Sequence, residues 1–227
     1  DAYDRMKRDM AEAPEALTGR VRFGCVESFV ADFAYDVVSR MHAEHPKVTF
    51  ELYSADGDDI RAGLDQDWLD LGILLEPVES AKYESVELPF TDRWGLIVAK
   101  DAPEAKLEGI STLGLANRPL ILPRRGIVLD EIASWVGTER EKLPVFLTQN
   151  LLTNGLLFVR RGLAAMVCVE GAFRLRPSED VVFVPFMPER RIAHKLVRRR
   201  NRRLPEAAEM FWMRAKEMLQ NGSDDPV

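Results

Sequence analysis

The sequence predicts an α/β fold, and a change of period within residues 19–41 is the first sign of it. Val21, Phe23 and Cys25 alternate with polar or small residues, as in a half-buried strand. From Phe29 onward the apolar residues fall at helical spacing. The second sign is that strand-like and helix-like segments then alternate along the chain, which is typical of parallel sheets with right-handed helical crossovers.

Ser28 stands between this first strand and the first helix, and we predict that it is the N-cap of the helix. The free N–H groups and the positive end of the helix dipole would then point out of the carboxyl end of the strand, a place suited to an oxygen-rich ligand. Two interpretations stay open from the residues alone. Ser28 either only caps the helix, or also forms half of a binding cleft for a small molecule.

The next elements continue the alternation. Residues 69–75 are apolar nearly throughout, which fits a strand covered on both faces and therefore a parallel sheet. Before this strand we predict a strand over 48–55, which follows a helix stop at His45 and Pro46, and a short helix through Leu64 that Asp58 or Asp59 can cap.

The middle of the chain predicts a second α/β unit of similar build. Its expected strands are 83–90, 93–100, 118–123, 145–148 and 163–169, and its expected helices are 113–116, 127–136 and 150–161. The chain closes with strands over 181–186 and 192–199 and with a helix from Pro205, which we expect to dock on the first lobe. We therefore expect two lobes, the second inserted in the first, with two crossing strands and a cleft where strand ends meet.

Composition excludes several classes of protein. Apolar residues make up 46% of the chain, charged residues 30%, and the net charge is −6, which is ordinary for a globular domain. The apolar runs are too short to span a bilayer, and no secretory signal opens the chain. The acidic balance argues against this chain alone binding nucleic acid. The arginines within 198–203 read as a nucleic-acid patch or as a solvated strand end, and the lack of interleaved aromatic residues favours the second.

Residues that could carry catalysis or bind a metal are few and scattered. Cys25 and Cys168 lie in apolar strand-like runs without CxxC spacing, which predicts buried free thiols in a reducing compartment. His42, His45 and His194 have no nucleophile signature beside them, and no phosphate-binding glycine loop is present. We find no catalytic set, expect no metal and no cofactor, and keep a small α/β transferase only as a distant alternative.

Six segments carry a resemblance to a known family, in family order and at family spacing. They are GRVRFGCVESF, HAEHPKVTFELY, DDIRAGLDQDWLDLGIL, ELPFTDRWGLIVAKDAP, FVRRGLAAMV and LVRRRNRRLPEAAEMF, and together they cover nearly everything from Leu17 to Leu219. The chain thus resembles the effector-binding domain of LysR-type transcriptional regulators, whose regulatory half is similar to the type 2 periplasmic solute-binding proteins.

The resemblance implies two Rossmann-like subdomains joined by two crossover strands, one formed by residues 17–92 plus 191–220 and the other by 93–190. Residues 1–16 would be the remnant of a linker helix, and 221–227 a disordered tail. The resemblance also implies a missing N-terminal winged helix-turn-helix domain, through which alone the full-length protein would contact DNA. We therefore expect a fragment of a cytoplasmic regulator, with paired regulatory domains as a homodimer, a tetramer at full length, and no membrane partner.

The resemblance further implies which residues contact a small-molecule effector. The matching positions are Ser28, after the first strand; Pro123, Arg124 and Arg125, in the turn before the first helix of the inserted subdomain; and Thr148, Gln149 and Asn150, in the polar segment that precedes FVRRGLAAM. Glu27 stands where a small residue is usual, and its carboxylate would repel an anion unless Arg124 or Arg125 paired with it. The arginines favour a carboxylate-bearing metabolite.

Two further positions depart from the family pattern. Gly57 replaces a common ligand-contacting Thr or Ser, and the usual GxGxxxLP reads GLAAMVCV. A stand-alone solute-binding protein of a transporter is the alternative function. It would require export, and the charged, helix-prone residues 1–16 favour the regulator.

Overall fold

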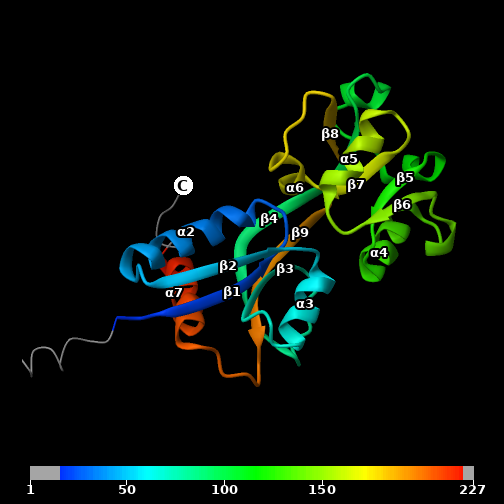
Figure 1. The fold of residues 1–227 in the computed structure, drawn as a ribbon. Coiled ribbons are helices and arrows are strands. Elements are labelled where there is room, and N and C mark those ends of the chain that lie inside the picture. Colours follow the sequence, from blue (N-terminus) through cyan, green and yellow to red (C-terminus); the bar gives the residue numbers. More distant parts are fainter. Residues whose placement is uncertain (1–15, 222–227) are drawn as a thin grey trace, which may run out of the picture.

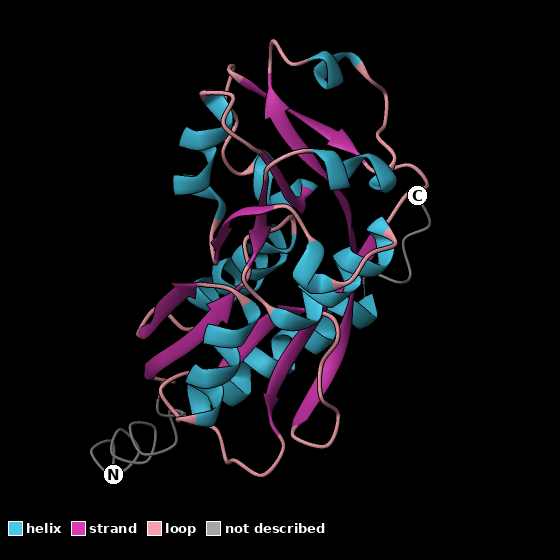
Figure 2. Cartoon of the chain, turned by 90° about the vertical axis from the view of Figure 1, so that its right-hand side faces the viewer, coloured by secondary structure: helices cyan, strands magenta, loops and turns pink. Residues whose placement is uncertain are grey.

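The computed structural model describes residues 16–221 and has two hydrophobic cores, each inside its own lobe (Figures 1 and 2). Lobe I is built on strands β1 (Gly19–Cys25), β2 (Val48–Ser54) and β3 (Leu71–Leu75), which pair in parallel in the order β2-β1-β3. The predicted parallel sheet of the first lobe is therefore confirmed.

Helices cover both faces of the lobe I sheet, because β1 presents alternate residues to opposite sides. These helices are α2 (Val30–Glu44) and α7 (Glu206–Asn221) on one face and α3 (Gly57–Asp65) on the other (Figure 1). Phe23 packs on Phe211 of α7 with ring centroids 5.3 Å apart. Its neighbour Gly24 faces α3, where an added Cβ would lie 2.8 Å from Ile60. The terminal helix thus docks on the first lobe, as the sequence predicts.

Lobe II repeats this construction. Its parallel strands are β5 (Leu120–Pro123), β6 (Val145–Gln149) and β7 (Ala165–Val169), its helices are α4 (Gly126–Val136), α5 (Leu152–Arg160) and α6 (Glu170–Arg174), and β8 (Val181–Pro185) lies antiparallel to β4. Three short 3₁₀ helices, Pro103–Lys106, Thr112–Asn117 and Arg140–Lys142, complete the lobe. The segment expected as a helix over 113–116 is the second of these.

Two long antiparallel strands, β4 (Tyr83–Ala99) and β9 (Arg191–Arg199), run from one lobe into the other (Figure 1). Residues 83–93 of β4 pair with β9, and residues 94–99 pair with β7 and β8, so one strand belongs to both sheets.

The expectation of two separate strands over 83–90 and 93–100 is wrong. The pairing of β4 with β9 shifts register between Leu88 and Thr91 and then continues. Pro89, which has no N–H to donate, occupies this irregularity, and a bulge is where a strand tolerates proline. The strand therefore continues past the proline instead of ending there.

Two predicted helix caps are also wrong. α2 begins after Phe29 without a side-chain cap, because the Ser28 hydroxyl is used elsewhere. α3 is capped by Asp56, which accepts from the backbone N–H groups of Asp58 and Asp59 at 3.0 Å each. The two residues proposed as caps are thus the donors.

The arginines near the end of β9 have structural partners in lobe I. Arg198 pairs with Glu84 and Glu209 at 2.8 Å and lies over the ring of Trp212. Arg202 donates to Asp70 at 3.1 Å. These contacts support the interpretation of a solvated strand end over that of a nucleic-acid patch.

Other expectations concern the ends of the chain and its thiols. The proposed linker remnant 1–16 and tail 221–227 lie outside the described residues except for Ala16 and for Asn221, which is the last residue of α7. Cys25 and Cys168 are free and buried, as predicted. Within residues 16–221, none of the helices combines the length and the apolar character that a bilayer crossing requires.

Candidate functional site

A cavity of about 110 Å³ lies between the two lobes, at the carboxyl ends of strands from both sheets. Lobe I contributes the loops after β1 and β2, and lobe II contributes the β5–α4 turn, the β6–α5 segment and β7. Most of its wall is apolar; these residues are Val26, Ala55, Leu75, Trp94, Pro123, Val128, Leu151, Leu152, Val167, Cys168, Val169 and Ala172. Six of the eight predicted site residues line the cavity, namely Glu27, Pro123, Arg124, Arg125, Gln149 and Asn150.

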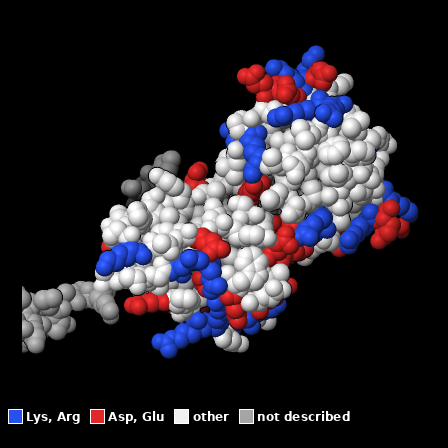
Figure 3. Space-filling view, in the orientation of Figure 1, with Lys and Arg blue, Asp and Glu red and all other residues white. Residues whose placement is uncertain are grey.

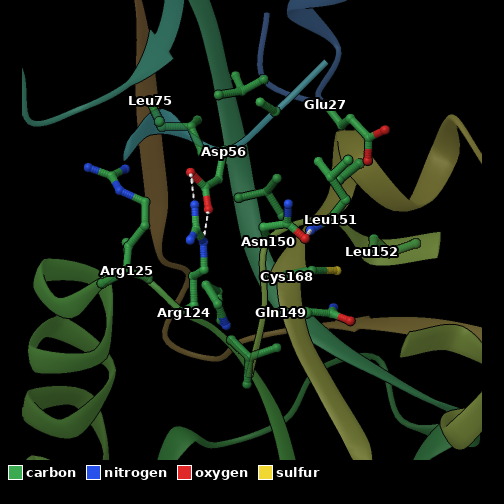
Figure 4. A pocket seen from close by; sticks show the side chains of 18 of the residues that line it. Glu27, Asp56, Leu75, Arg124, Arg125, Gln149, Asn150, Leu151, Leu152 and Cys168 are labelled. Carbon is green, nitrogen blue, oxygen red and sulfur yellow. Dashed lines mark hydrogen bonds and ion pairs between the residues drawn. The ribbon is translucent and has the colours of Figure 1, made fainter. Parts of the chain in front are cut away.

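Arg124 spans the cavity mouth from lobe II to lobe I (Figure 4). Its Nε lies 2.6 Å from Oδ2 of Asp56 and its Nη2 3.2 Å from Oδ1, while Nη2 also lies 2.6 Å from Asp59. Burial raises the pKa of Asp56, but the hydrogen bonds from Arg124 and from the backbone outweigh it and lower that pKa overall. Asp56 is therefore a firmly ionised carboxylate in a two-pronged contact.

Arg125 makes a second link between the lobes beside the first. Its Nε donates to Oδ1 of Asp58 at 2.9 Å, and its side chain is only 7% exposed. On the space-filling surface, acidic and basic side chains adjoin where the lobes meet (Figure 3). The two arginines are the cationic residues of the cavity wall, and each is already paired with carboxylates of lobe I.

Glu27 forms a third link. It accepts a hydrogen bond from Arg176, which follows α6 in lobe II, and its side chain is 10% exposed. Neither Arg124 nor Arg125 pairs with Glu27, because both arginines reach the Asp56–Asp59 turn instead. A different arginine therefore neutralises the carboxylate that would repel an anion.

Ser28 and Thr148 lie outside this cavity wall. Thr148 is exposed and lines a neighbouring pocket with Gln149 and Asn150. Gln149 places its amide nitrogen 3.1 Å from the sulfur of Met166, and its oxygen lies against Gly155 of α5. Its amide thus faces lobe II.

Ser28 is fully buried and joins a hydrogen-bonded node at the junction of the lobes. Its hydroxyl donates to Asp92 at 2.8 Å and lies 2.7 Å from Nε2 of His194. Asp92 also accepts the backbone N–H of Gly171 in α6 at 3.0 Å. The node therefore links lobe I, both crossing strands and lobe II.

The buried node does not have the geometry of a catalytic triad. Nδ1 of His194 faces the carbonyl oxygen of Phe90 at 3.1 Å rather than a carboxylate, and the serine bonds the carboxylate directly. Burial lowers the pKa of His194 from its ordinary value. Ser28, Asp92 and His194 are each at most 1% exposed, which leaves no room for a substrate.

Sequence reasoning missed Asp56, Arg176, Asp92 and His194. The signal for Asp56 was present, because it follows the carboxyl end of β2 just as Ser28 follows that of β1. His194 lies two residues from Ile192 and two from Leu196, so all three share the buried face of β9, which indicates a core histidine. Within residues 16–221, no cluster of three or more His, Cys, Asp or Glu side chains could hold a metal ion.

The two lobes, their crossing strands and the cavity between them define the type 2 periplasmic-binding-protein fold. The chain belongs to the family of LysR substrate binding domains, whose profile matches residues 14–220.

A curated relative is the uncharacterized HTH-type transcriptional regulator YvbU of Bacillus subtilis, 23% identical over 72% of this chain. The chain spans only 55% of the length of that relative.

Solved structures of LysR regulators share the fold. The effector binding domain of QuiR in complex with shikimate has a TM-score of 0.75 at 16% identity, and the match covers 93% of this chain and 100% of the chain of that domain. HinK, a LysR family transcriptional regulator from Pseudomonas aeruginosa, has a TM-score of 0.70 at 18% identity, covering 95% of this chain and 76% of its own. The oxidized form of OxyR has a TM-score of 0.67 at 22% identity, and the match covers 93% of this chain and 100% of the OxyR chain in that structure.

Proposed function

We propose that this chain is the effector-sensing part of a LysR-type transcriptional regulator and binds a small carboxylate-bearing metabolite between its lobes. The observation that carries the proposal is the interlobe cavity with Arg124 and Arg125 at its mouth. Their planar guanidinium groups suit a two-pronged contact with a carboxylate, and the apolar wall behind them suits a hydrocarbon body. Among relatives of the same fold, the QuiR domain was determined with shikimate.

Binding transmits a signal only if the ligand prefers one arrangement of the lobes. We propose that residues 17–92 plus 191–220 and residues 93–190 are the units that reorient. Two cores support this division, although Ile192 packs in the core of lobe II. In the full-length protein, the lobe angle would bias how a homodimer or tetramer sits on DNA through an N-terminal helix-turn-helix domain in the cytoplasm.

Among the predicted contact residues, we retain Glu27, Pro123, Arg124, Arg125, Gln149 and Asn150 as wall residues of the effector site. Ser28 and Thr148 would influence the effector site indirectly, without contacting the effector. Ser28 would orient the junction through Asp92, and Thr148 borders the adjoining pocket.

A thermal-shift screen of short aliphatic acids, aromatic acids and shikimate, each beside its uncharged amide, tests the proposal. A ligand at a hundred times its Kd adds about 2.7 kcal/mol to stability, which gives a clear rise in Tm. Arg124→Gln should abolish the shift, whereas Arg160→Gln, which removes an arginine paired with Asp180 on lobe II away from the cavity, should preserve it. Acids that shift both variants equally would contradict the assignment of the site.

A further inference from the structure

The guanidinium of Arg124 is already engaged in the contact that a ligand carboxylate would use. Asp56 meets it with both oxygens (Figure 4). Asp59 supplies a further oxygen to Nη2. The two partners come from different lobes, since Asp56 caps α3 and Arg124 precedes α4. An internal carboxylate therefore occupies the arginine from the opposite side of the cleft.

Asp56 is fixed to lobe I independently of Arg124. Its Oδ1 caps α3 by accepting from the N–H groups of Asp58 and Asp59, and its side chain is 9% exposed. Arg124 is 43% exposed and reaches over from its own lobe. If the arginine withdrew, Asp56 would keep its backbone hydrogen bonds and the favourable helix dipole. The contact can thus break without leaving a buried, unpaired charge.

Contacts of the same kind flank the cavity at both edges. Arg125 pairs with Asp58 beside Arg124, and Arg176 pairs with Glu27 at the other edge. With these contacts made, the cavity measures about 110 Å³, whereas pockets for metabolite-sized ligands are typically about 300–1,000 Å³. The cavity as it stands therefore suits at most a small acid, and a bulkier one needs the lobes to part at one edge.

We propose that Asp56 is a built-in occupant of the effector's carboxylate subsite, and that the effector binds by exchanging its own carboxylate for Asp56 on Arg124 while the lobes part. This inference rests on the proposed function of the cleft. The exchange conserves charge and hydrogen bonds at the guanidinium. The free energy of binding therefore depends on burial of the apolar part of the ligand and on the interlobe contacts that are lost.

The exchange also defines the class of ligand. Behind Arg124 the wall consists mainly of apolar side chains such as Val128, Leu152 and Val169. A second carboxylate on the ligand would meet the released Asp56 and its neighbour Asp59, with Arg125 still paired. The site therefore favours a compact, largely apolar monocarboxylate over a dicarboxylate.

Asp56→Asn is the decisive variant, because asparagine caps a helix as well as aspartate does but carries no charge for Arg124. Asp180→Asn is the matched control, since it removes one carboxylate from an arginine pair remote from the cavity. Spin labels on exposed Arg40→Cys and Lys142→Cys would report the lobe separation, because the native Cys25 and Cys168 are buried. Without any ligand, Asp56→Asn should lengthen or broaden the measured distance, and Asp180→Asn should not.

Binding of isobutyrate, cyclohexanecarboxylate and benzoate, with their amides and with succinate, tests the exchange itself. An internal competitor that is bound in about 90–99% of molecules weakens apparent affinity about 10- to 100-fold, so Asp56→Asn should tighten at least one of these monocarboxylates by tenfold or more. The amides should gain less than threefold, because they carry no charge for Arg124. Succinate should gain at least as much as the monocarboxylates, because the variant removes both the internal competitor and one of the carboxylates that repel a second ligand carboxylate. Equal affinity in wild type and Asp56→Asn, or no binding of any of the three acids to either, would overturn the exchange.

The two proposals can fail separately. An acid that requires Arg124 but binds wild type and Asp56→Asn equally would overturn the exchange and leave the effector site standing. The opposite failure combines two results: the lobes open in Asp56→Asn, but the acids bind whether or not Arg124 is present. That result would overturn the effector site and with it the exchange. It would still show that the Asp56–Arg124 contact holds the lobes together.

Discussion

The hydroxyl of Ser28 donates a 2.8 Å hydrogen bond to the carboxylate of Asp92 at the junction of the two lobes. Because the carboxylate also accepts the N–H of Gly171, three segments distant in sequence meet at one buried group. The junction is thus organised by polar contacts in a site without solvent, where each lost partner is costly.

Ser28→Ala should lower the free energy of unfolding by about 1–3 kcal/mol, because Asp92 and His194 would each lose a buried hydrogen-bond partner. Urea denaturation followed by circular dichroism measures the change. Ser80→Ala, at an exposed position, is the matched control and should stay within about 0.5 kcal/mol of wild type. A loss for Ser28→Ala as small as that of the control would show that the node contributes little.

Stability should fall on acidification through the range below pH 6.5. Burial lowers the pKa of His194 from its ordinary value of 6.5, so in this range the unfolded chain binds a proton that the folded chain does not. The contribution is complete above pH 6.5 and declines toward the folded-state pKa. His194→Gln should flatten this part of the profile of unfolding free energy against pH. An unchanged slope in the variant would assign the pH dependence to other groups.

Gly171→Ala should destabilise the protein more than a typical surface substitution. An added Cβ would lie 2.4 Å from the backbone nitrogen of Phe29 and 2.6 Å from Oδ2 of Asp92, so α6 must move away from the node. We expect a loss of about 1–3 kcal/mol, measured by chemical denaturation. Gly114→Ala, where nothing lies within 4 Å of the added Cβ, should be close to neutral. Comparable losses at both positions would indicate that α6 adapts freely.

Neither thiol should react with Ellman's reagent at pH 8 while the protein is folded. Burial raises the pKa of Cys25 to about 12 and raises that of Cys168 as well, so the reactive thiolate is scarce in addition to being inaccessible. In urea both cysteines should react within minutes. Rapid reaction of one thiol in the native protein would reveal local opening, which Cys25→Ser and Cys168→Ser would assign.

The sequence predicts the elements well where periodicity and packing agree. The strand over 19–25 and the apolar stripe of α2 can be read from their spacing, because a sheet covered on both faces and an amphipathic helix each need a fixed pattern. It fails for β4, because Pro89 suggests a break and only the pairing with β9 carries the strand past it.

Long-range partners explain what sequence reasoning missed at the site. Arg124 is recognisable from its turn before a helix, but Asp56 lies 68 residues away, and nothing in the local pattern pairs them. Likewise, Ser28 is a reasonable cap until its partners Asp92 and His194 arrive from 64 and 166 residues along the chain. Tertiary contacts at the junction override the local preference for capping.

The shared strand β4 determines what kind of motion the molecule permits. It pairs with β9 from Glu84 to Arg93 with a single bulge. The lobes are therefore not joined by flexible linkers that would allow a wide hinge motion. Residues 194–197 of β9 are also paired with β3, and residues 94–99 of β4 with β7 and β8, so relative rotation of the lobes must be absorbed mainly as extra twist between residues 91–93 and 191–193. Under the proposed function, a reorientation of the lobes would therefore twist these strands, and it would reach the Tyr83–Arg199 end of their ladder as well as the cleft.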